Sequence, residues 1–347
     1  MQINKNILNK IHKEDCLKFL KKLPKNSVDL IVSSPPYNLG KEYEKRRALN
    51  IYLEEQTEVL TECCRVLKDT GSLFWQVGAY SENGIVIPLD IPFFQILEKL
   101  KMKPINRIVW ARQHGLHARN KFSFRHETIL WFAKSTNYKF FLDAVRVPQK
   151  YQNKKSYNGE NKGKLSSNPD GKNPGDIWVF RNVKHNHEEQ TIHPCQFPED
   201  LIGRIILSTT KENDIVYDPY MGTGTTAIVA KESKRKFIGT EIDPKYMKTA
   251  NLRLKKKPDT NKTFANLKNL REFVKKNNVE NIKDYKFAKQ ISKNPSLDSK
   301  IYPEEHHQKE LFERLSFEEK CFGADRKGQK RPKDPLKHNH GLFKNKK

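Results

Sequence analysis

The chain has 347 residues and a formal net charge of +25 at pH 7, because 66 basic residues face 41 acidic ones. This length suits one large α/β domain with an extension. The positive charge favours a polyanionic partner, most simply nucleic acid, over a lysine-rich protein that is merely well solvated. Five cysteines without a Cys-x-x-Cys pair argue against a zinc ribbon and favour reduced thiols. Residues 1–6 lack a signal-peptide core and no apolar run could span a bilayer, so we expect a cytoplasmic protein without membrane association.

The first expected elements lead to a pair of prolines. A strand ends near Asp15, a helix follows over residues 17–23, and the apolar run 28–32 predicts a buried strand. The next residues are Ser33-Ser34-Pro35-Pro36-Tyr37-Asn38. Because prolines lack a ladder donor and fix φ, the chain must leave the sheet at the carboxyl end of this strand, where open α/β sheets bind ligands. The alternative interpretation is a Pro-Pro turn with a surface tyrosine.

Apolar elements and polar loops then alternate as far as residue 133. Residues 38–50 are polar and predict a mobile loop beside the prolines. A helix is expected over 51–67, with a helix stop at Asp69-Thr70-Gly71. The later elements are predicted as a strand over 72–78, a helix over 92–101, and strands over 105–110 and 128–132.

The composition changes between residues 134 and 190. Residues 151–176 are mainly Lys, Asn, Ser and Gly, with too few apolar side chains to form a core alone. The segment His193-Pro194-Cys195-Gln196-Phe197-Pro198 follows, and then a helix through Leu201. His193 and Cys195 lack partner ligands for zinc, so we expect no metal.

Residues 215–226 predict a strand, a tight glycine turn and a helix. Gly222 and Gly224 permit close backbone approach to a ligand at a helix N-terminus. No Lys-Ser or Lys-Thr pair follows, which argues against a phosphate loop, and the missing third glycine argues against a nicotinamide oxidoreductase. A second strand over 236–240 ends at Glu241, about twenty residues on, the interval at which an acidic residue binds ribose hydroxyls.

Together these motifs resemble the amino-group DNA methyltransferases that use S-adenosylmethionine. Ser34-Pro35-Pro36-Tyr37 is similar to the catalytic S/D/N-P-P-Y motif of that family. Residues 218–226, Asp-Pro-Tyr-Met-Gly-Thr-Gly-Thr-Thr, are similar to its cofactor-binding D-P-F-x-G-x-G-T-T motif. The catalytic motif comes first, which is the order in the beta group, whose members belong to bacterial restriction-modification systems. The resemblance covers residues 11–257.

The resemblance implies an α/β fold, a Rossmann-like doubly wound sheet with an inserted DNA-recognition segment. Beyond residue 257 it ends, and only two further helices are expected, over 267–275 and 304–315, before a basic arm. The implied regions are a catalytic half over 1–133, an inserted target-recognition segment over 134–192, an S-adenosylmethionine-binding half over 193–257 and a basic C-terminal extension over 258–347.

The resemblance also implies the catalytic residues Ser34, Pro35, Pro36 and Tyr37. The Ser34 side chain and the Pro35 carbonyl would accept the hydrogens of an exocyclic amino group, and Tyr37 would stack on a base flipped out of the duplex. In the family a His-Glu pair precedes the strand at the target-base pocket, where this chain has His126 and Glu127. The alternative for this pair is an ordinary hydrogen-bonded strand start.

The cofactor residues implied by the resemblance come from several predicted elements. Asp15 would contact adenine, although an Asp before a helix also serves as an N-cap. Many family members have lysine where Phe197 stands, so this contact departs from the family pattern. The implied cofactor-binding residues are Asp15, His193, Pro194, Phe197, Asp218, Pro219, Tyr220, Gly222, Gly224, Thr225, Thr226 and Glu241.

The expected partner is double-stranded DNA. Lysines of the inserted segment would contact phosphates; the alternative is a solvated loop. A cognate restriction endonuclease that shares the site and a homodimer are left open. The implied DNA-binding residues are Lys150, Lys154, Lys155, Lys162, Lys164 and Lys172.

The base remains to be chosen. Serine at position 34 is commoner in relatives that act on cytosine N4, and aspartate in those that act on adenine N6, so cytosine N4 is favoured and adenine N6 is the alternative. An alternative of another class is an inactive DNA-binding regulator with the same fold. The inserted segment disfavours an RNA or small-molecule substrate.

Overall fold

The computed structural model describes residues 3–256 with gaps at 43, 83, 113–116, 148–153, 167, 169–170 and 185–186. The helices expected over 267–275 and 304–315, the rest of the C-terminal extension and Lys150 lie outside the described residues. Within the described part, no helix is both long and apolar enough to cross a membrane.

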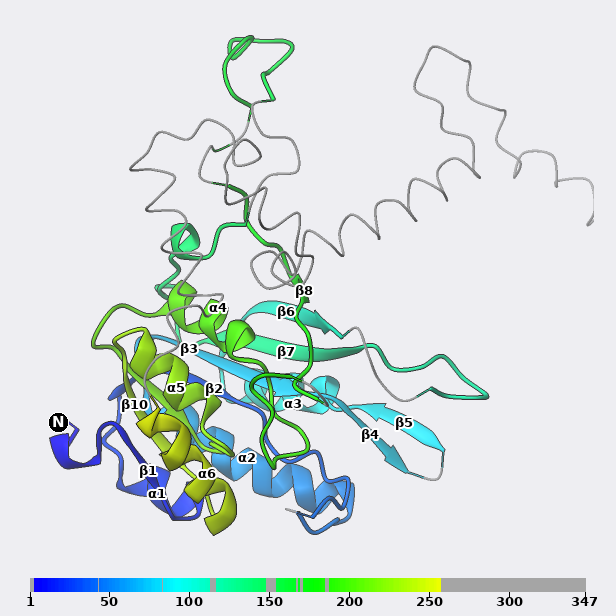
Figure 1. Ribbon diagram of the computed structural model, residues 1–347, viewed down its shortest axis with the longest axis vertical. Coiled ribbons are helices and arrows are strands. Elements are labelled where there is room, and N and C mark those ends of the chain that lie inside the picture. Colours follow the sequence, from blue (N-terminus) through cyan, green and yellow to red (C-terminus); the bar gives the residue numbers. More distant parts are fainter. Residues whose placement is uncertain are drawn as a thin grey trace, which may run out of the picture. The chain divides into compact units, whose positions relative to one another are not determined.

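Among the described residues, eight strands form one mixed sheet in the order β1-β10-β9-β2-β3-β7-β6-β8 (Figure 1). The first five strands in this order pair in parallel, β7 is antiparallel to both neighbours, and β8 is parallel to β6. Their bounds are β1 Lys10–His12, β2 Val28–Ser33, β3 Leu67–Val77, β6 Lys103–Ala111, β7 His126–Ala133, β8 Ile177–Val179, β9 Ile215–Asp218 and β10 Lys236–Thr240.

The strands β2 and β9 are neighbours at the centre of the sheet, paired through Leu30 with Val216 and Ile31 with Tyr217. From β2 the chain crosses to β3 on one side, and from β9 it crosses to β10 on the other. The strand order therefore reverses between them, and ligands of open α/β sheets bind at such a switch point. The proline pair after β2 and the glycine turn after β9 consequently leave the sheet side by side.

Helices cover both faces of the sheet, as the predicted doubly wound fold requires (Figure 1). Because alternate strand residues face opposite sides, Ile31 and Trp75 pack with α1, α2 and α3, whereas Leu30 and Phe74 pack with α4 and α5. The predicted fold class is thus confirmed. The helices are α1 Cys16–Lys22, α2 Leu49–Val66, α3 Asp90–Lys99, α4 Glu199–Thr209, α5 Thr225–Glu232 and α6 Pro244–Lys255, with short 3-10 turns η1 Lys5–Ile7 and η2 Leu142–Ala144.

The predicted end of the helix over 51–67 is correct to within one residue, but the predicted stop signal and the predicted start of the next strand at residue 72 are wrong. The helix α2 ends at Val66 and β3 begins at Leu67, so Asp69-Thr70-Gly71 lies within a strand and is no helix stop. A Cβ atom on Gly71 would lie 2.7 Å from Leu67 Cδ1 and 2.9 Å from the Asp29 carbonyl oxygen. Gly71 therefore serves close packing between β2 and β3.

Two pieces of sheet are not evident from the sequence. One is the separate hairpin of β4 Ala79–Glu82 and β5 Ile85–Pro88. The other is β8, which lies in the segment expected to be an insert. Trp178 and Phe180 are buried there, and the Trp110 indole N–H donates to the Phe180 carbonyl at 3.0 Å. The segment therefore adds to the core of the sheet as well as to its surface.

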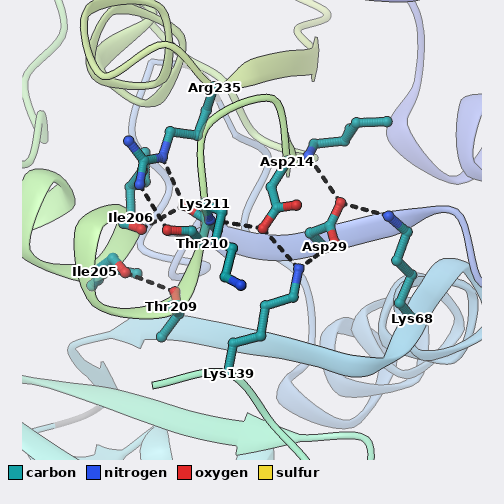
Figure 2. A network of polar contacts seen from close by, with 11 residues as sticks. Asp29, Lys68, Lys139, Ile205, Ile206, Thr209, Thr210, Lys211, Asp214 and Arg235 are labelled. Carbon is teal, nitrogen blue, oxygen red and sulfur yellow. Dashed lines mark hydrogen bonds and ion pairs between the residues drawn. The ribbon is translucent and has the colours of Figure 1, made fainter. Parts of the chain in front are cut away.

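At the amino edge of the central strands, Asp29 of β2 joins a network of ion pairs (Figure 2). Its carboxylate accepts from Lys68 at 2.7 Å, from Lys139 at 2.9 Å and from the Ile215 amide at 3.0 Å. Lys139 also pairs with Asp214 at 2.8 Å. Burial opposes ionisation of Asp29, but these three donors hold its pKa below the usual value. The network ties β2, β3 and β9 to the segment after β7.

Candidate active site at the carboxyl edge of the sheet

A cavity of about 170 Å³ opens beyond the carboxyl ends of β1, β2, β9 and β10. The proline loop, the glycine turn and the segment 193–197 form its wall together with residues that follow β1 and β10. The structure thus brings together most of the residues singled out from the sequence. Those that line the cavity are Asp15, Ser34, Pro35, Pro36, Tyr37, His193, Phe197, Pro219, Tyr220, Gly222, Thr225 and Glu241, whereas Pro194, Asp218, Gly224 and Thr226 do not.

The charged side chains of the lining are acidic. They are Glu14, Asp15, Glu241 and Asp243, and no lysine or arginine of the described residues lines the cavity. This is a local exception in a chain with a net charge of +25. A cavity of this charge suits a cationic ligand.

Asp218 is fully buried behind the glycine turn and holds it in place. Its carboxylate accepts from the hydroxyls of Ser33 and Thr226 and from the Tyr220 amide at 3.0 Å. Burial raises the pKa of Asp218 to about 6, against lowering by these hydrogen bonds. Asp218 and Thr226 therefore join β2, β9 and α5 beneath the cavity.

The two glycines of the turn have different surroundings. Gly222, with φ of +54°, faces the His193 ring, whose nearest atom would be 3.7 Å from an added Cβ. Gly224, with φ of +87°, is the N-cap of α5, and its Cβ would lie 2.8 Å from the Ala250 Cβ. Gly222 therefore leaves space on the cavity side, and Gly224 allows α6 to pack against the turn.

Two acidic residues of the lining have backbone partners. Glu241 accepts from the Gly222 amide at 2.7 Å and the Asp243 amide at 2.8 Å. Burial raises the pKa of Glu241 against these hydrogen bonds. Asp15 is the N-cap of α1 and accepts from the Lys18 amide at 3.0 Å. The N-cap interpretation of Asp15 is thus observed, and both carboxylates still line the cavity.

The segment that contains His193 closes one side of the cavity. The His193 ring lies 4.5 Å from the Tyr246 ring, and its Nδ1 accepts from the Cys195 amide at 3.1 Å. Burial lowers the pKa of His193 to about 4, so the imidazole is neutral at pH 7. Among the described residues, no three His, Cys, Asp or Glu side chains gather as a metal site would require.

The proline loop is fastened from α2 and from residues 38–48. The Tyr52 hydroxyl donates to the Pro36 carbonyl at 2.6 Å. Glu44 accepts from the amides of Asn38 and Leu39, both at 2.7 Å. Asn38 is buried, adopts a φ of +60° and exchanges side-chain hydrogen bonds with the Arg47 backbone. The segment expected to be a mobile loop therefore supplies several of the contacts that hold the proline loop.

The His-Glu pair divides between two environments. His126 is exposed, whereas Glu127 turns toward the proline loop and accepts from the Tyr37 hydroxyl at 3.2 Å. Glu127 also pairs with Arg112 at 2.8 Å. The interpretation that this pair helps to hold the pocket thus fits Glu127 alone.

Four of the lysines expected to bind DNA, Lys154, Lys155, Lys162 and Lys164, lie in a loop that is closed by its own backbone. Lys155 bridges to Leu165, and the Ser166 amide donates to the Lys154 carbonyl at 2.8 Å. The side chains of Lys154, Lys155, Lys162 and Lys164 are exposed and that of Lys172 is half-buried, and none of the five lines the cavity.

Several residues of the site escape sequence analysis. Gln196 accepts from the Thr191 hydroxyl at 2.7 Å and from the Thr223 hydroxyl at 3.3 Å, which joins the His193 segment to the glycine turn. Arg253 of α6 donates to the Thr223 carbonyl at 2.7 Å. Asp243 could have been found, because Asp followed by Pro is a helix-start signal, whereas the other contacts depend on the tertiary fold.

Comparison with known proteins agrees with this geometry. A family model described as DNA methylase matches residues 28–252. Type II methyltransferase M.BglII of Bacillus subtilis is 58% identical over 316 residues, which cover 90% of this chain and 88% of that protein. The DNA adenine methyltransferase YhdJ of Escherichia coli strain K12 is 36% identical over 245 residues, covering 69% and 80%. The solved structure of the cytosine-N4-specific PvuII DNA methyltransferase shares the fold, with a TM-score of 0.57 and 20% identity over 76% of this chain and 91% of that chain.

The fold and the cavity therefore define a Rossmann-like DNA methylase with a proline loop and a glycine turn at one edge of the sheet. Because the proline motif precedes the glycine turn, the motif order is that of the beta group. The chain belongs to the family of amino DNA methyltransferases that modify adenine N6 or cytosine N4, and the predicted relationship to restriction-modification enzymes is confirmed.

Proposed function

We infer that this protein transfers a methyl group from S-adenosylmethionine to the N4 amino group of a cytosine within a specific site of duplex DNA. The observation that carries this inference is that Ser34-Pro35-Pro36-Tyr37 and the glycine turn line the same cavity. When bound there, S-adenosylmethionine supplies the methyl group of its sulfonium, and the sulfur that loses this methyl group becomes a thioether. The acidic lining suits its positive charge.

The proline loop is suited to activate a weak nucleophile. An exocyclic amino nitrogen shares its lone pair with the base ring, so it needs acceptors for its hydrogens before it can attack. Ser34 Oγ and the Pro35 carbonyl are such acceptors, and they stabilise the positive charge that develops on nitrogen. The Tyr37 ring supplies a stacking surface for a base that has left the duplex.

The choice of cytosine N4 rests on Ser34, since aspartate is commoner at this position in adenine N6 enzymes. The names of the relatives point both ways: YhdJ is a DNA adenine methyltransferase, and the PvuII enzyme is cytosine-N4-specific. Adenine N6 is therefore the second candidate. The exposed lysines Lys154, Lys155, Lys162 and Lys164 are proposed to contact DNA phosphates. We also propose that the protein acts in the cytoplasm, together with a cognate endonuclease that recognises the same DNA sequence.

Mass spectrometry of deoxynucleosides tests the proposal directly. DNA from cells that express the wild-type protein should contain N4-methyldeoxycytidine, and DNA from cells that express Ser34→Ala should not. N6-methyldeoxyadenosine in its place would assign the adenine reaction. If neither appears, and purified protein binds duplex DNA without transferring methyl groups, the inactive regulator is the correct alternative.

A further inference from the structure

The hydroxyl group of Tyr37 lies at the centre of a polar cluster beside the cavity. Ser34 Oγ is 3.2 Å away, Glu127 Oε2 is 3.2 Å away, and Gln76 Nε2 is 2.5 Å away. Gln76 is buried on β3 and also donates to Glu127. The Tyr37 ring packs on Gly78, where an added Cβ would be 2.8 Å from Cε2. The hydroxyl is therefore fixed from three directions.

The two oxygens of Glu127 have separate partners. Oε1 pairs with Arg112 at 2.8 Å, and Oε2 accepts from Tyr37 and Gln76. Both members of the ion pair are largely buried, with side-chain exposures of 19% for Arg112 and 15% for Glu127. Since a carboxylate can only accept hydrogen bonds, this pair fixes which way protons are donated around Tyr37.

The donors and acceptors of the cluster admit one consistent arrangement. Tyr37 has one proton and donates it to Glu127. Burial, and then the charge of Glu127, raise the pKa of Tyr37 well above its usual value, so this proton stays on the phenol. The Gln76 amide donates to the phenol oxygen. The contact with Ser34 can then be made only if the Ser34 hydroxyl donates to Tyr37.

We propose that Glu127 is a positioning residue, which through Tyr37 turns the proton of Ser34 away from the substrate and leaves Ser34 Oγ an acceptor for the amino group. This inference rests on the proposed function. With the opposite direction of donation, the Ser34 proton would point toward the amino hydrogens and repel them. The chain Ser34→Tyr37→Glu127 thus explains how a serine, which can donate or accept, acts as a pure acceptor.

A double-mutant cycle of Glu127→Gln and Tyr37→Phe tests the chain. Phenylalanine keeps the stacking ring, and glutamine keeps the shape of the glutamate. Each change should lower the single-turnover rate of methyl transfer by about tenfold to a hundredfold, because a group at the chemistry is misdirected. S-adenosylmethionine affinity, measured by calorimetry, should stay unchanged. The double variant should be no slower than the slower single variant, because both act through one chain.

The matched control is Asp90→Asn. Asp90 is buried on α3 and pairs with Arg107 of β6, whose side chain is 54% exposed, so it shares with Glu127 a buried carboxylate and an arginine partner but does not line the cavity. This variant should lose stability and keep the wild-type single-turnover rate. A merely structural Glu127 would behave in the same way as Asp90.

Three results would overturn the proposal. The first is losses that multiply in the double variant, and the second is a wild-type rate in folded Glu127→Gln. The third is a wild-type rate in Tyr37→Phe, which decides the question even if Glu127→Gln does not fold. An inactive wild-type protein would refute the proposed function and, with it, the hydrogen-bond chain Ser34→Tyr37→Glu127. An active wild type whose two substitutions act independently in the double-mutant cycle would refute only the hydrogen-bond chain.

Discussion

Asp29 and Asp218 lie at opposite edges of the same pair of central strands, and their surroundings differ in kind. Asp29 is paired with two lysines and a backbone amide. Asp218 accepts from two hydroxyls and an amide, all of which are neutral donors. Accordingly the pKa of Asp29 is lowered and that of Asp218 is raised by burial to about 6. One edge uses charge to join strands, and the other orders a turn with neutral donors beside an acidic cavity.

This contrast predicts that the amino edge controls stability and the carboxyl edge controls chemistry. The largest expected effect is that of Asp29→Ala, which should lower the free energy of unfolding by about 3 kcal/mol, because it leaves Lys68 and Lys139 without their buried partner. Urea unfolding measures this loss. Asp69→Ala is the control. Asp69 is 71% exposed and its ion pair with Lys134 is long, at 3.7 Å, so this substitution should change the free energy of unfolding little. An equal loss in both variants would contradict the role of the amino edge.

Ser34→Ala should have the converse effect. Loss of one acceptor for the developing charge should slow methyl transfer by on the order of a hundredfold or more, with unchanged unfolding. Tyr37→Ala should be similarly slow, because the base loses its stacking surface. Single-turnover rates and thermal unfolding of the same preparations give both quantities. Turnover close to that of the wild type in either variant would refute the mechanism.

Glu241→Ala should weaken binding of S-adenosylmethionine by roughly tenfold or more, because a carboxylate that accepts from a charged or hydroxyl-bearing ligand is removed. Its hydrogen bond with the Gly222 amide would also disappear. Calorimetry on wild type, Glu241→Ala and the exposed helix variant Glu98→Ala provides the comparison. Equal affinities in all three would show that Glu241 does not contact the cofactor.

The pH dependence of stability should separate the two carboxylates. The raised pKa of Asp218 means that its stabilising contribution is complete below the ordinary aspartate value of 3.8 and is lost as pH rises through about 6. The lowered pKa of Asp29 means that its contribution is present above 3.8 and is lost as pH falls further. The stability difference between wild type and Asp218→Asn should therefore shrink from pH 4 to pH 7, whereas that for Asp29→Asn should stay level. Parallel curves would contradict this assignment.

The smallest expected effect per residue concerns the lysine loop. We expect a smaller salt dependence of duplex binding when Lys154, Lys155, Lys162 and Lys164 are replaced with glutamine. The slope of log affinity against log salt concentration should decrease in magnitude by up to about 0.9 for each phosphate that is no longer neutralised. Methylation of the cognate site should fall as well. A charge-matched control for these substitutions replaces Lys18, Lys21, Lys25 and Lys99.

Deletion of residues 258–347 should lower the affinity for duplex DNA but keep sequence preference. Loss of preference in the deletion, without an effect of the loop lysines, would show that recognition lies outside the loop.

Much of the fold can be predicted because its signals are local. The strand β2 is a short apolar run ended by prolines, and the turn after β9 combines glycines with a helix start, so the sequence locates both closely. The end of α2 is predicted to within one residue, but the start of β3 is placed five residues late because Gly71 has the sequence signature of a helix stop. In the folded protein that glycine is required by its neighbour Asp29, which lies far away in the sequence.

The site can be predicted only in part for the same reason. The sequence identifies the motif residues, but the contacts that orient them come from other elements. It places Glu127 near the pocket without its partner Tyr37, and it identifies neither Gln76 nor Arg112. The strand β8 has only three residues in a polar segment, so it lacks a detectable period. Such pairings across the sheet have no signature in a single sequence.

The acidic lining of the cavity has a consequence for how DNA approaches the protein. A strongly basic protein attracts the phosphate backbone of DNA, and this attraction alone would also draw phosphates into the opening of the cavity. Four carboxylates at that opening oppose this. We expect the cavity to admit a cation and an uncharged base while the sugar-phosphate strand stays at its rim. The distribution of charge thus favours the cofactor and the base inside the cavity and the phosphates outside it, before any hydrogen bond is formed.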